Sequence, residues 1–337
     1  MSSRNFRFPL FTALLFGICA TAVAQDGIND LPVEIRTIMQ QPRYTGATWG
    51  LRVIKVNSGQ VIYDLNSQSR LLTGSVRKLY SIAVTLDELG PDYRFSTPVF
   101  RDGEVDRSGR LRGDLILMAK GDLTMGGRDN GDDTVAVTDF DHCDANNLGG
   151  AILTAPDPLS GMARLAQQVA QSGIRKVLGD VIIDDRLFQQ FRVPNQELLI
   201  SPIVVNDNRI DLMILPTRPD EAALVEWRPH TQSFAVHRAV KTVGANRATE
   251  ITLIQPRPRE GNVSGQIAID YVSPLPGVPT LVQTFRVDDP SAPQDPAAFA
   301  RTIFIEALKR AGVTVEARPV GPNPSNKLPS PDSYSAC

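Results

Sequence analysis

The sequence has few cysteines and no excess of positive charge. It contains three Cys in 337 residues, and its net charge is −2 at pH 7 with a pI near 6.0. So few cysteines cannot build the disulfide framework of a small secreted domain. A chain without a basic excess also lacks the charge that binding to nucleic-acid phosphates requires. We therefore expect an ordinary hydrophobic core and no nucleic-acid partner.

Sequence patterns for metal and nucleotide sites are missing as well. There is no H-E-x-x-H or C-x-x-C spacing, no G-x-S-x-G elbow and no phosphate-binding G-x-x-x-x-G-K-[ST] loop. Side chains that can ligate metals do gather in segment 126–150. They are Asp129, Asp132, Asp133, Asp139, Asp141, His142, Cys143 and Asp144. Their spacing does not fit an EF-hand, so we interpret the segment as a solvated loop. A bound cation is the alternative; otherwise we expect no metal and no organic cofactor.

The N-terminus has the pattern of a signal peptide. Arg4 and Arg7 lie beside an apolar run at 8–24, which ends in Ala-Val-Ala before Gln25. We predict a signal peptide over 1–24 and an exported protein of the periplasm or cell-wall space. An uncleaved membrane anchor is the alternative. No later segment is long and apolar enough to cross a membrane.

The rest of the chain changes character near residues 100 and 290. A short helix at 30–41 and a β-hairpin at 47–67 are predicted first. Residues 100–185 then follow a β–loop–α–β order, and runs of period two from 209 to 287 predict an antiparallel β-rich block. An amphipathic helix begins near Asp295, and the last twenty residues are rich in Pro, Ser and Asn.

The stretch "LLTGSVRKLYSIAVTLDELGPD" contains the one S-x-x-K of the chain, Ser75 and Lys78. An apolar stripe follows at helical spacing and predicts a helix packed on a core: Leu79, Ile82, Ala83, Leu86 and Leu89. Gly90-Pro91 is typical of the residues that end a helix. Residues at i and i+3 share one helix face about 5–6 Å apart at Cβ. Ser75 and Lys78 are therefore predicted to be neighbours.

A serine hydroxyl needs an adjacent base to become a nucleophile. A lysine amine is a base only when neutral, so its pKa must fall, and burial and the positive end of a helix both act in that direction. Free backbone N–H groups of a first helical turn also help to stabilise an oxyanion. The competing interpretation is that Ser75 only caps the helix and Lys78 is solvated.

The context of this pair resembles a known family. "GSVRKLYSIAVTLDELGPDYRFSTPVF" is similar to the active-serine segment of low-molecular-weight penicillin-binding proteins of the D-alanyl-D-alanine carboxypeptidase/endopeptidase type. "LRGDLILMAKGDLTM", "LAQQVAQSGIRKVLGDVIIDD", "SPIVVNDNRIDLMI" and "FARTIFIEALKRAGVTV" resemble later parts of the same family in the same order. The likeness runs from about residue 30 to 325, with Val76 where the family usually has Thr.

The resemblance implies that Ser75 is the acylated nucleophile and Lys78 its general base. It implies peptidoglycan peptides as substrates and β-lactams as covalent inhibitors. The companion motifs S-x-N and K-T-G are not found after the last predicted helix. Ser3-Arg4-Asn5 lies in the signal segment, "VVNDN" (204–208) better fits a strand–loop of the inserted domain, and "KTVG" (241–244) precedes that helix. The chain therefore resembles the front part of such an enzyme.

The resemblance implies an α/β (α+β) fold in which a partial β-lactamase/transpeptidase-like domain is interrupted by a β-rich insertion. The predicted parts are a signal peptide at 1–24, the first part of the transpeptidase-like domain at 25–100, the insertion at 101–287, and a return helix with linker at 288–337. Two alternatives stay open: a catalytically silent, truncated cell-wall-binding protein, and an unrelated exported β-rich binding protein in which Ser75 caps a helix.

Overall fold

The computed structural model describes residues 28–193, 198–330, 333, 335 and 336. The chain divides into two compact units, Met1–Tyr93 and Arg94–Cys337. The predicted signal peptide lies outside the described residues. Among the helices of the described part, none combines the length and the apolar character that crossing a bilayer takes.

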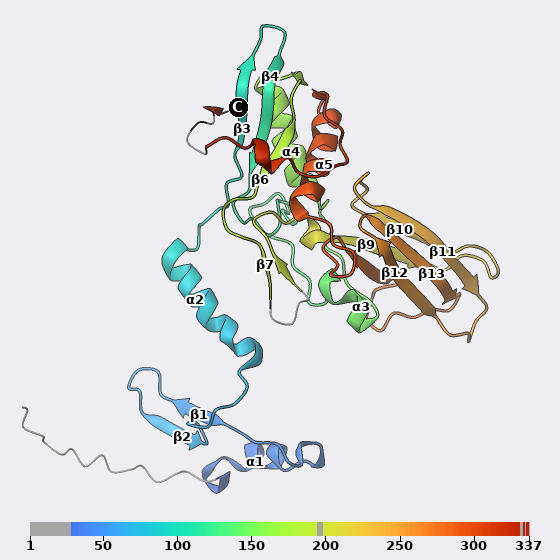
Figure 1. Cartoon of the computed structure of the whole chain (residues 1–337). Helices are drawn as coiled ribbons and strands as arrows, with labels where there is room; N and C mark the ends of the chain where they lie inside the picture. The colour runs from blue at the N-terminus through green and yellow to red at the C-terminus, as the bar shows by residue number, and fades with distance from the viewer. Residues whose placement is uncertain (1–27, 194–197, 331–332, 334, 337) are drawn as a thin grey trace, which may run out of the picture. The chain divides into compact units, whose positions relative to one another are not determined.

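The described part of the first unit consists of two α-helices, a β-hairpin and short 3-10 turns (Figure 1). Helix α1 (Val33–Met39) precedes strands β1 (Leu51–Ile54) and β2 (Val61–Leu65), which pair antiparallel. This confirms the short helix and the hairpin that the sequence predicts. A small core forms around three buried side chains: Leu31, Met39 and Leu65.

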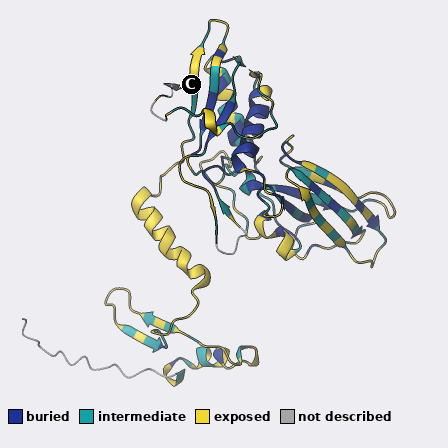
Figure 2. Ribbon diagram, viewed as in Figure 1, coloured by how far each residue is buried: buried dark blue, intermediate teal, exposed yellow. Residues whose placement is uncertain are grey.

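Helix α2 (Lys78–Leu89) completes the first unit. Gly90 ends it with φ +78°, a backbone conformation that glycine adopts without strain. The predicted helix and its end are therefore confirmed. Its packing is not, because every residue of α2 is exposed (Figure 2).

The second unit begins with a mixed six-stranded sheet. Strands β3 (Val99–Val105) and β4 (Arg110–Met118) form an antiparallel hairpin. Strands β5 (Lys176–Val177) and β6 (Val181–Asp184) both pair parallel to β4. The short strands β15 (Thr314–Val315) and β16 (Ser335–Ala336) pair with β5 and β3.

Two helices pack together beside this sheet. Helix α4 (Ser160–Gln171) connects β4 to β5, which confirms the predicted β–loop–α–β order. Helix α5 (Pro296–Arg310) packs against α4 and β6 and is buried from Pro296 to Leu308 (Figure 2). Asp295 caps it by accepting a hydrogen bond from the Ala297 N–H, and Pro296 occupies the first helical position, which has no intrahelical use for an N–H.

Buried Arg301 fixes α5 to its surroundings. Its guanidinium donates to the Val181 carbonyl at 2.7 Å and to the carbonyls of Arg318 and Pro319 at 3.0 Å, and it pairs with Asp180. A buried charge is tolerated only when it is paired and hydrogen-bonded in this way. The helix after the β-rich block is thus a central core element of the second unit.

Two three-stranded sheets form the β-rich part of the second unit. One has the order β10 (Leu224–Arg228), β9 (Arg209–Leu215), β14 (Leu281–Arg286). The other has the order β11 (Ala235–Val243), β13 (Glu260–Ala268), β12 (Glu250–Arg257). Their inner side chains belong to one hydrophobic cluster, in which the Phe234 and Phe285 rings lie 5.7 Å apart.

One pairing contradicts the predicted antiparallel block. β11 and β13 run parallel, because the β12 hairpin intervenes and returns the chain along the far side of β13. Strand β10 is also not predicted from the sequence, because its five residues are too short a run to show a clear period of two. The remaining short elements are helix α3 (Ala145–Leu148) and the hairpin of β7 (Phe191–Arg192) and β8 (Leu199–Ile200).

Candidate functional site

Ser75 lies in a 3-10 turn over Gly74–Arg77, and Lys78 is the first residue of α2. Gly74 has φ +51° and directs the chain into this turn. The Lys78 N–H donates to the carbonyls of Ser75 and Val76, so the turn continues directly into the helix. The two predicted site residues are therefore close in the chain and held by consecutive helical turns.

Both side chains are exposed in the first unit. Within the described residues, no hydrogen bond joins the Ser75 hydroxyl to the Lys78 amine. The predicted general-base role depends on burial of Lys78. The residues that the structure describes do not bury it. The roles of Ser75 and Lys78 stay a prediction.

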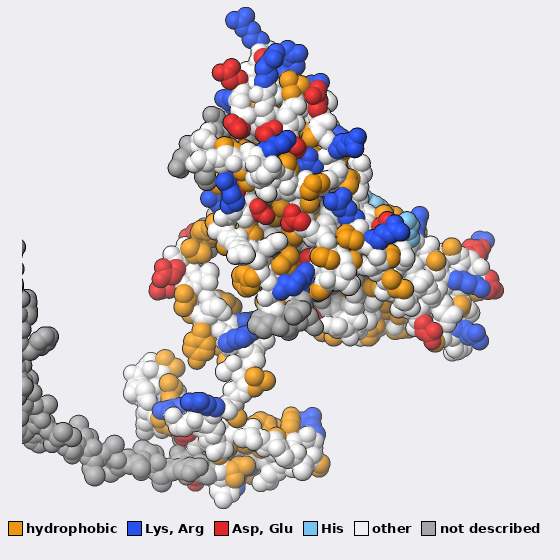
Figure 3. All heavy atoms as spheres, viewed as in Figure 1, with side chains coloured by type: hydrophobic (Ala, Val, Ile, Leu, Met, Phe, Trp, Pro, Cys, Tyr) orange, Lys and Arg blue, Asp and Glu red, His pale blue; other side chains and the backbone are white. Residues whose placement is uncertain are grey.

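The apolar stripe of α2 is uncovered, which corrects the prediction that it packs on a core. Leu79 is 68% exposed, Ile82 55% and Leu86 51%. Hydrophobic side chains stand at the surface of this helix in Figure 3. No element among residues 28–93 covers the stripe. Contiguous exposed apolar side chains of this kind mark a surface that another structure covers.

The two stretches that partly resemble the companion motifs, "VVNDN" (204–208) and "KTVG" (241–244), both have structural roles. Residues 206–208 form a tight turn before β9 with φ near +50° at each position, which Asn and Asp tolerate better than other side chains. Lys241 and Thr242 belong to β11, where Lys241 pairs with Asp220 at 2.9 Å and buried Thr242 hydrogen-bonds to Thr217. Each stretch therefore has a local structural role within the second unit.

A buried polar cluster surrounds His142 in the second unit. The His142 Nδ1 lies 2.7 Å from a carboxylate oxygen of Asp211, and its Nε2 lies 2.7 Å from Asp207. Arg128 lies 3.0 Å from Asp207 and also pairs with Asp141, while Arg228 lies 3.2 Å from Asp211. No local sequence pattern joins His142 to Asp207 and Asp211, because both lie more than sixty residues from it.

The protonation of this cluster follows from its contacts. Burial by itself would lower the pKa of His142, but the hydrogen bonds and charges of Asp207 and Asp211 outweigh it and raise the pKa to about 9. Burial by itself would raise the pKa of Asp207, but His142 and Arg128 lower it. At neutral pH His142 is therefore an imidazolium, and the carboxylate of Asp207 beside it is ionised.

The cluster around His142 also brings together possible metal ligands of the acidic segment. Ligand atoms of Asp141, His142 and Asp207 lie within 4.8 Å of one another, a spacing that suits a cation. The Arg128 guanidinium, however, contacts both carboxylates and lies 3.5 Å from the His142 Nε2. A guanidinium already occupies the place of the cation. The prediction of a solvated loop is wrong at His142, which is buried by these contacts.

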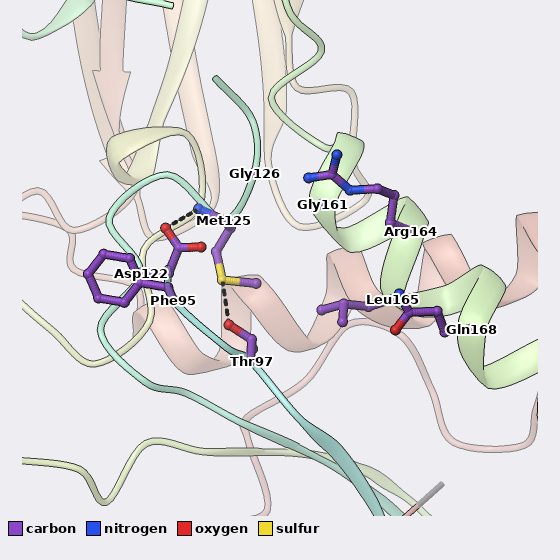
Figure 4. Close-up of a pocket in the computed structure, with 9 residues that line it drawn as sticks. All are labelled: Phe95, Thr97, Asp122, Met125, Gly126, Gly161, Arg164, Leu165 and Gln168. Atoms are coloured by element: carbon purple, nitrogen blue, oxygen red, sulfur yellow. Dashed lines mark hydrogen bonds between the residues drawn. The ribbon is translucent and has the colours of Figure 1, made fainter. Parts of the chain in front are cut away.

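Cys143 and the pocket beside α4 offer no second nucleophile. Cys143 is exposed, and desolvation together with the charge of Asp144 raises the pKa of its thiol, which disfavours the reactive thiolate. The pocket in Figure 4 has a volume of about 160 Å³ and lies between the 122–126 turn and α4. In it, Asp122 accepts N–H groups of its own turn and Arg164 pairs with Asp129. Both charges of the pocket thus serve local structure.

Comparison with known proteins identifies the family. The model of the D-Ala-D-Ala carboxypeptidase 3 (S13) family matches residues 31–325, which include the S-x-x-K turn and α5. The chain belongs to the S13 family. This confirms the resemblance to D-alanyl-D-alanine carboxypeptidases that the sequence motifs indicate.

The chain is also similar to proteins of known sequence or structure. A D-alanyl-D-alanine carboxypeptidase from Actinomadura sp. (strain R39) is 27% identical over 91% of this chain and 52% of its own length. Penicillin binding protein 4 from Haemophilus influenzae matches with a TM-score of 0.53 at 19% identity, over 81% of this chain and 54% of its own. A second structure of that protein, with a β-lactam bound, gives 0.49.

The structural match confirms the predicted mixed α/β fold class. The chain spans about half the length of these two proteins. No residue role follows from these matches, and the predicted domain boundaries remain predictions.

Proposed function

We propose that this S13 protein carries the nucleophile of a serine-type D-alanyl-D-alanine carboxypeptidase or endopeptidase that acts on peptidoglycan stem peptides. The observation that carries the proposal is the family match, which extends over Ser75, Lys78 and the helix that follows them. Ser75 is the proposed nucleophile and Lys78 its general base. An exported location and the absence of any cofactor belong to the same proposal.

The reaction is an acyl transfer. The Ser75 Oγ attacks the carbonyl carbon of the penultimate D-Ala, and its proton passes to Lys78. The C–N bond breaks, the proton is delivered to the leaving amine, and D-Ala departs. Water then hydrolyses the ester on Ser75. A β-lactam would react with the same oxygen, opening its amide bond to leave a penicilloyl ester.

The base role makes a demand on the surroundings of α2. Lys78 must be neutral to accept the proton, and desolvation is the usual way to achieve this. Because the stripe of α2 and Lys78 are exposed among the described residues, the proposal requires further structure to cover them. The residues that bind the substrate carboxylate are not part of the proposal.

Labelling with a fluorescent penicillin tests the proposal. We expect a covalent adduct on Ser75, located by peptide mass spectrometry and lost in Ser75→Ala. Lys78→Ala should slow acylation by about 10²-fold or more, the usual contribution of a general base. Ser81→Ala is the matched control, because Ser81 is an exposed serine of α2 whose hydroxyl bonds only backbone carbonyls.

A folded chain that shows no adduct would contradict catalysis by Ser75 and Lys78. That result would leave the silent cell-wall-binding protein as the better account. An adduct that survives Ser75→Ala would show that the nucleophile is a different residue.

A further inference from the structure

The surface loop at 129–135 contains the one Asn-Gly sequence of the chain, Asn130-Gly131. Asp129 and Val135 form an isolated antiparallel bridge, so the residues between them make a short turn within the second unit. Asn130 and Gly131 are both exposed in this turn. Asparagine is a thermolabile residue, and a following glycine leaves its side-chain amide open to attack, because glycine has no Cβ to shield its backbone nitrogen.

The backbone nitrogen of Gly131 is accessible. Its N–H donates to the Asp129 carboxylate at 2.8 Å, and no backbone carbonyl among the described residues accepts it. Gly131 has φ +82°, and a Cβ built on it would meet no heavy atom within 4 Å other than those of its chain neighbours. This nitrogen is therefore neither tied into a strand ladder nor covered by packing.

The side chain of Asn130 is held by a single weak contact among the described residues. Its amide nitrogen donates to the Thr134 hydroxyl at 3.0 Å, and that hydroxyl donates to Asp132 at 2.5 Å. An exposed hydrogen bond between neutral groups adds little to stability, since water replaces it readily. The amide of Asn130 is therefore free to turn towards the Gly131 nitrogen.

We propose that Asn130 is a site of spontaneous deamidation, with water as the co-reactant. The Gly131 nitrogen loses its proton to solvent and forms a bond to the side-chain carbonyl carbon of Asn130. The bond from that carbon to the amide nitrogen breaks, and the amide nitrogen takes up a proton and leaves as ammonia. Water then opens the resulting succinimide at either of its two carbonyl carbons, which gives aspartate or isoaspartate at position 130. Nothing is oxidised or reduced, and the proposal does not depend on acyl transfer by Ser75.

Deamidation would change this turn in two ways. It adds a negative charge to an acidic loop and removes the donor that contacts the Thr134 hydroxyl. In the isoaspartate product, one more carbon enters the main chain between positions 130 and 131. The hydrogen bond from the Asn130 N–H to the Thr134 carbonyl, 3.1 Å long in the unmodified chain, then no longer fits. The isoaspartate form therefore loses pairing that closes the turn.

Peptide mass spectrometry of the full chain, after incubation in mildly alkaline buffer, tests the proposal. We expect the Asn130 amide to be replaced by an acid with time, and faster as the pH rises, because the attacking nitrogen must lose its proton. Fragment ions specific to the extra main-chain carbon should identify isoaspartate beside aspartate. Asn246 is the control within the same unit, because it is exposed but precedes Arg247, and it should keep its amide.

Two variants test the ring closure. In Gly131→Ala the rate should fall about tenfold or more, because the added Cβ hinders the approach to the nitrogen. In Asn130→Gln the side chain is one carbon longer and would have to close a larger ring, so the modification should be lost. This second variant leaves Gly131 in place, so it keeps the test valid if alanine distorts the turn.

Hydrogen exchange tests the effect on the loop. The Ala136 N–H donates to the Arg128 carbonyl at 2.7 Å beside the bridge. It should exchange faster in the aged protein that contains isoaspartate than in fresh protein.

Three results would overturn the proposal. One is an Asn130 amide that persists after long incubation, or that is lost no faster than the amide of Asn246. Another is a product that contains aspartate without isoaspartate, which would exclude the succinimide. The third is an Asn130→Gln protein that is modified at position 130 as fast as the parent.

Discussion

At the scale of single residues, His142 links folding to pH. Its contacts with Asp207 and Asp211 favour the imidazolium and, against the opposing effect of burial, raise its pKa in the folded protein to about 9. The unfolded chain has the ordinary histidine pKa of about 6.5. Stability from this group is therefore fully present below pH 6.5 and is lost as pH rises towards 9.

We predict that the free energy of unfolding falls on the order of 3 kcal/mol between pH 6.5 and 9 because of His142. Urea denaturation across this range measures the fall. In His142→Gln the fall should largely disappear, because the group that titrates is gone. His237→Gln, which removes an exposed histidine, should keep the slope of the parent protein. Equal slopes in all three proteins would contradict the assignment.

At the scale of elements, the two amphipathic helices differ in what covers them. Ile303 of α5 is fully buried, whereas Ile82 of α2 is 55% exposed. A buried isoleucine cut back to alanine leaves a cavity, while an exposed one leaves none. We predict that Ile303→Ala costs about 2–5 kcal/mol of unfolding free energy, and that Ile82→Ala costs about 0.5 kcal/mol or less.

Chemical denaturation of the two variants measures this difference. A large cost for Ile82→Ala would show that the stripe of α2 is covered in solution. A small cost for Ile303→Ala would contradict the burial of α5.

The start of α5 gives a second test at this scale. The Asp295 carboxylate accepts the Ala297 N–H, so Asp295→Ala should cost about 1 kcal/mol. Asp295→Asn keeps the acceptor and should cost much less. Burial raises the pKa of nearby Asp185, the negative charge of Asp295 raises it further, and both substitutions relieve that repulsion equally. Their difference in denaturation free energy therefore reports the cap alone.

The elements that sequence predicts well are those with local signals. The hairpin around "NSGQ", the end of α2 at Gly90 and the cap-and-proline start of α5 all depend on residues within one turn of each other. The parallel pairing of β11 with β13 does not, because it depends on the path of the chain through β12. Periodicity also does not predict that the α2 stripe is exposed, because it identifies the apolar face of a helix but not the structure that covers that face.

The candidate sites divide in the same way. Ser75 and Lys78 are found from spacing because they lie three residues apart on one helical turn. The His142 cluster joins residues far apart in the chain, so no local pattern indicates it.

At the scale of the whole molecule, the two units have separate cores. The small cluster around Leu31, Met39 and Leu65 lies in the first unit, and the large cluster of the second unit contains residues from 99 onward. We predict that a chain beginning at Arg94 unfolds cooperatively, with the same urea midpoint as the second unit of the full chain. Loss of the cooperative transition would show that the second unit depends on the first.

The guanidinium of Arg128 has a consequence for how this protein meets its environment. Held between Asp141 and Asp207, it serves as a covalently attached counter-ion that cannot diffuse away. In other proteins, clusters of carboxylates often bind calcium or zinc ions, and a chelator that removes the ion can unfold the protein. In this protein the neutralising charge belongs to the Arg128 side chain, so the cluster around His142 does not depend on the supply of divalent ions.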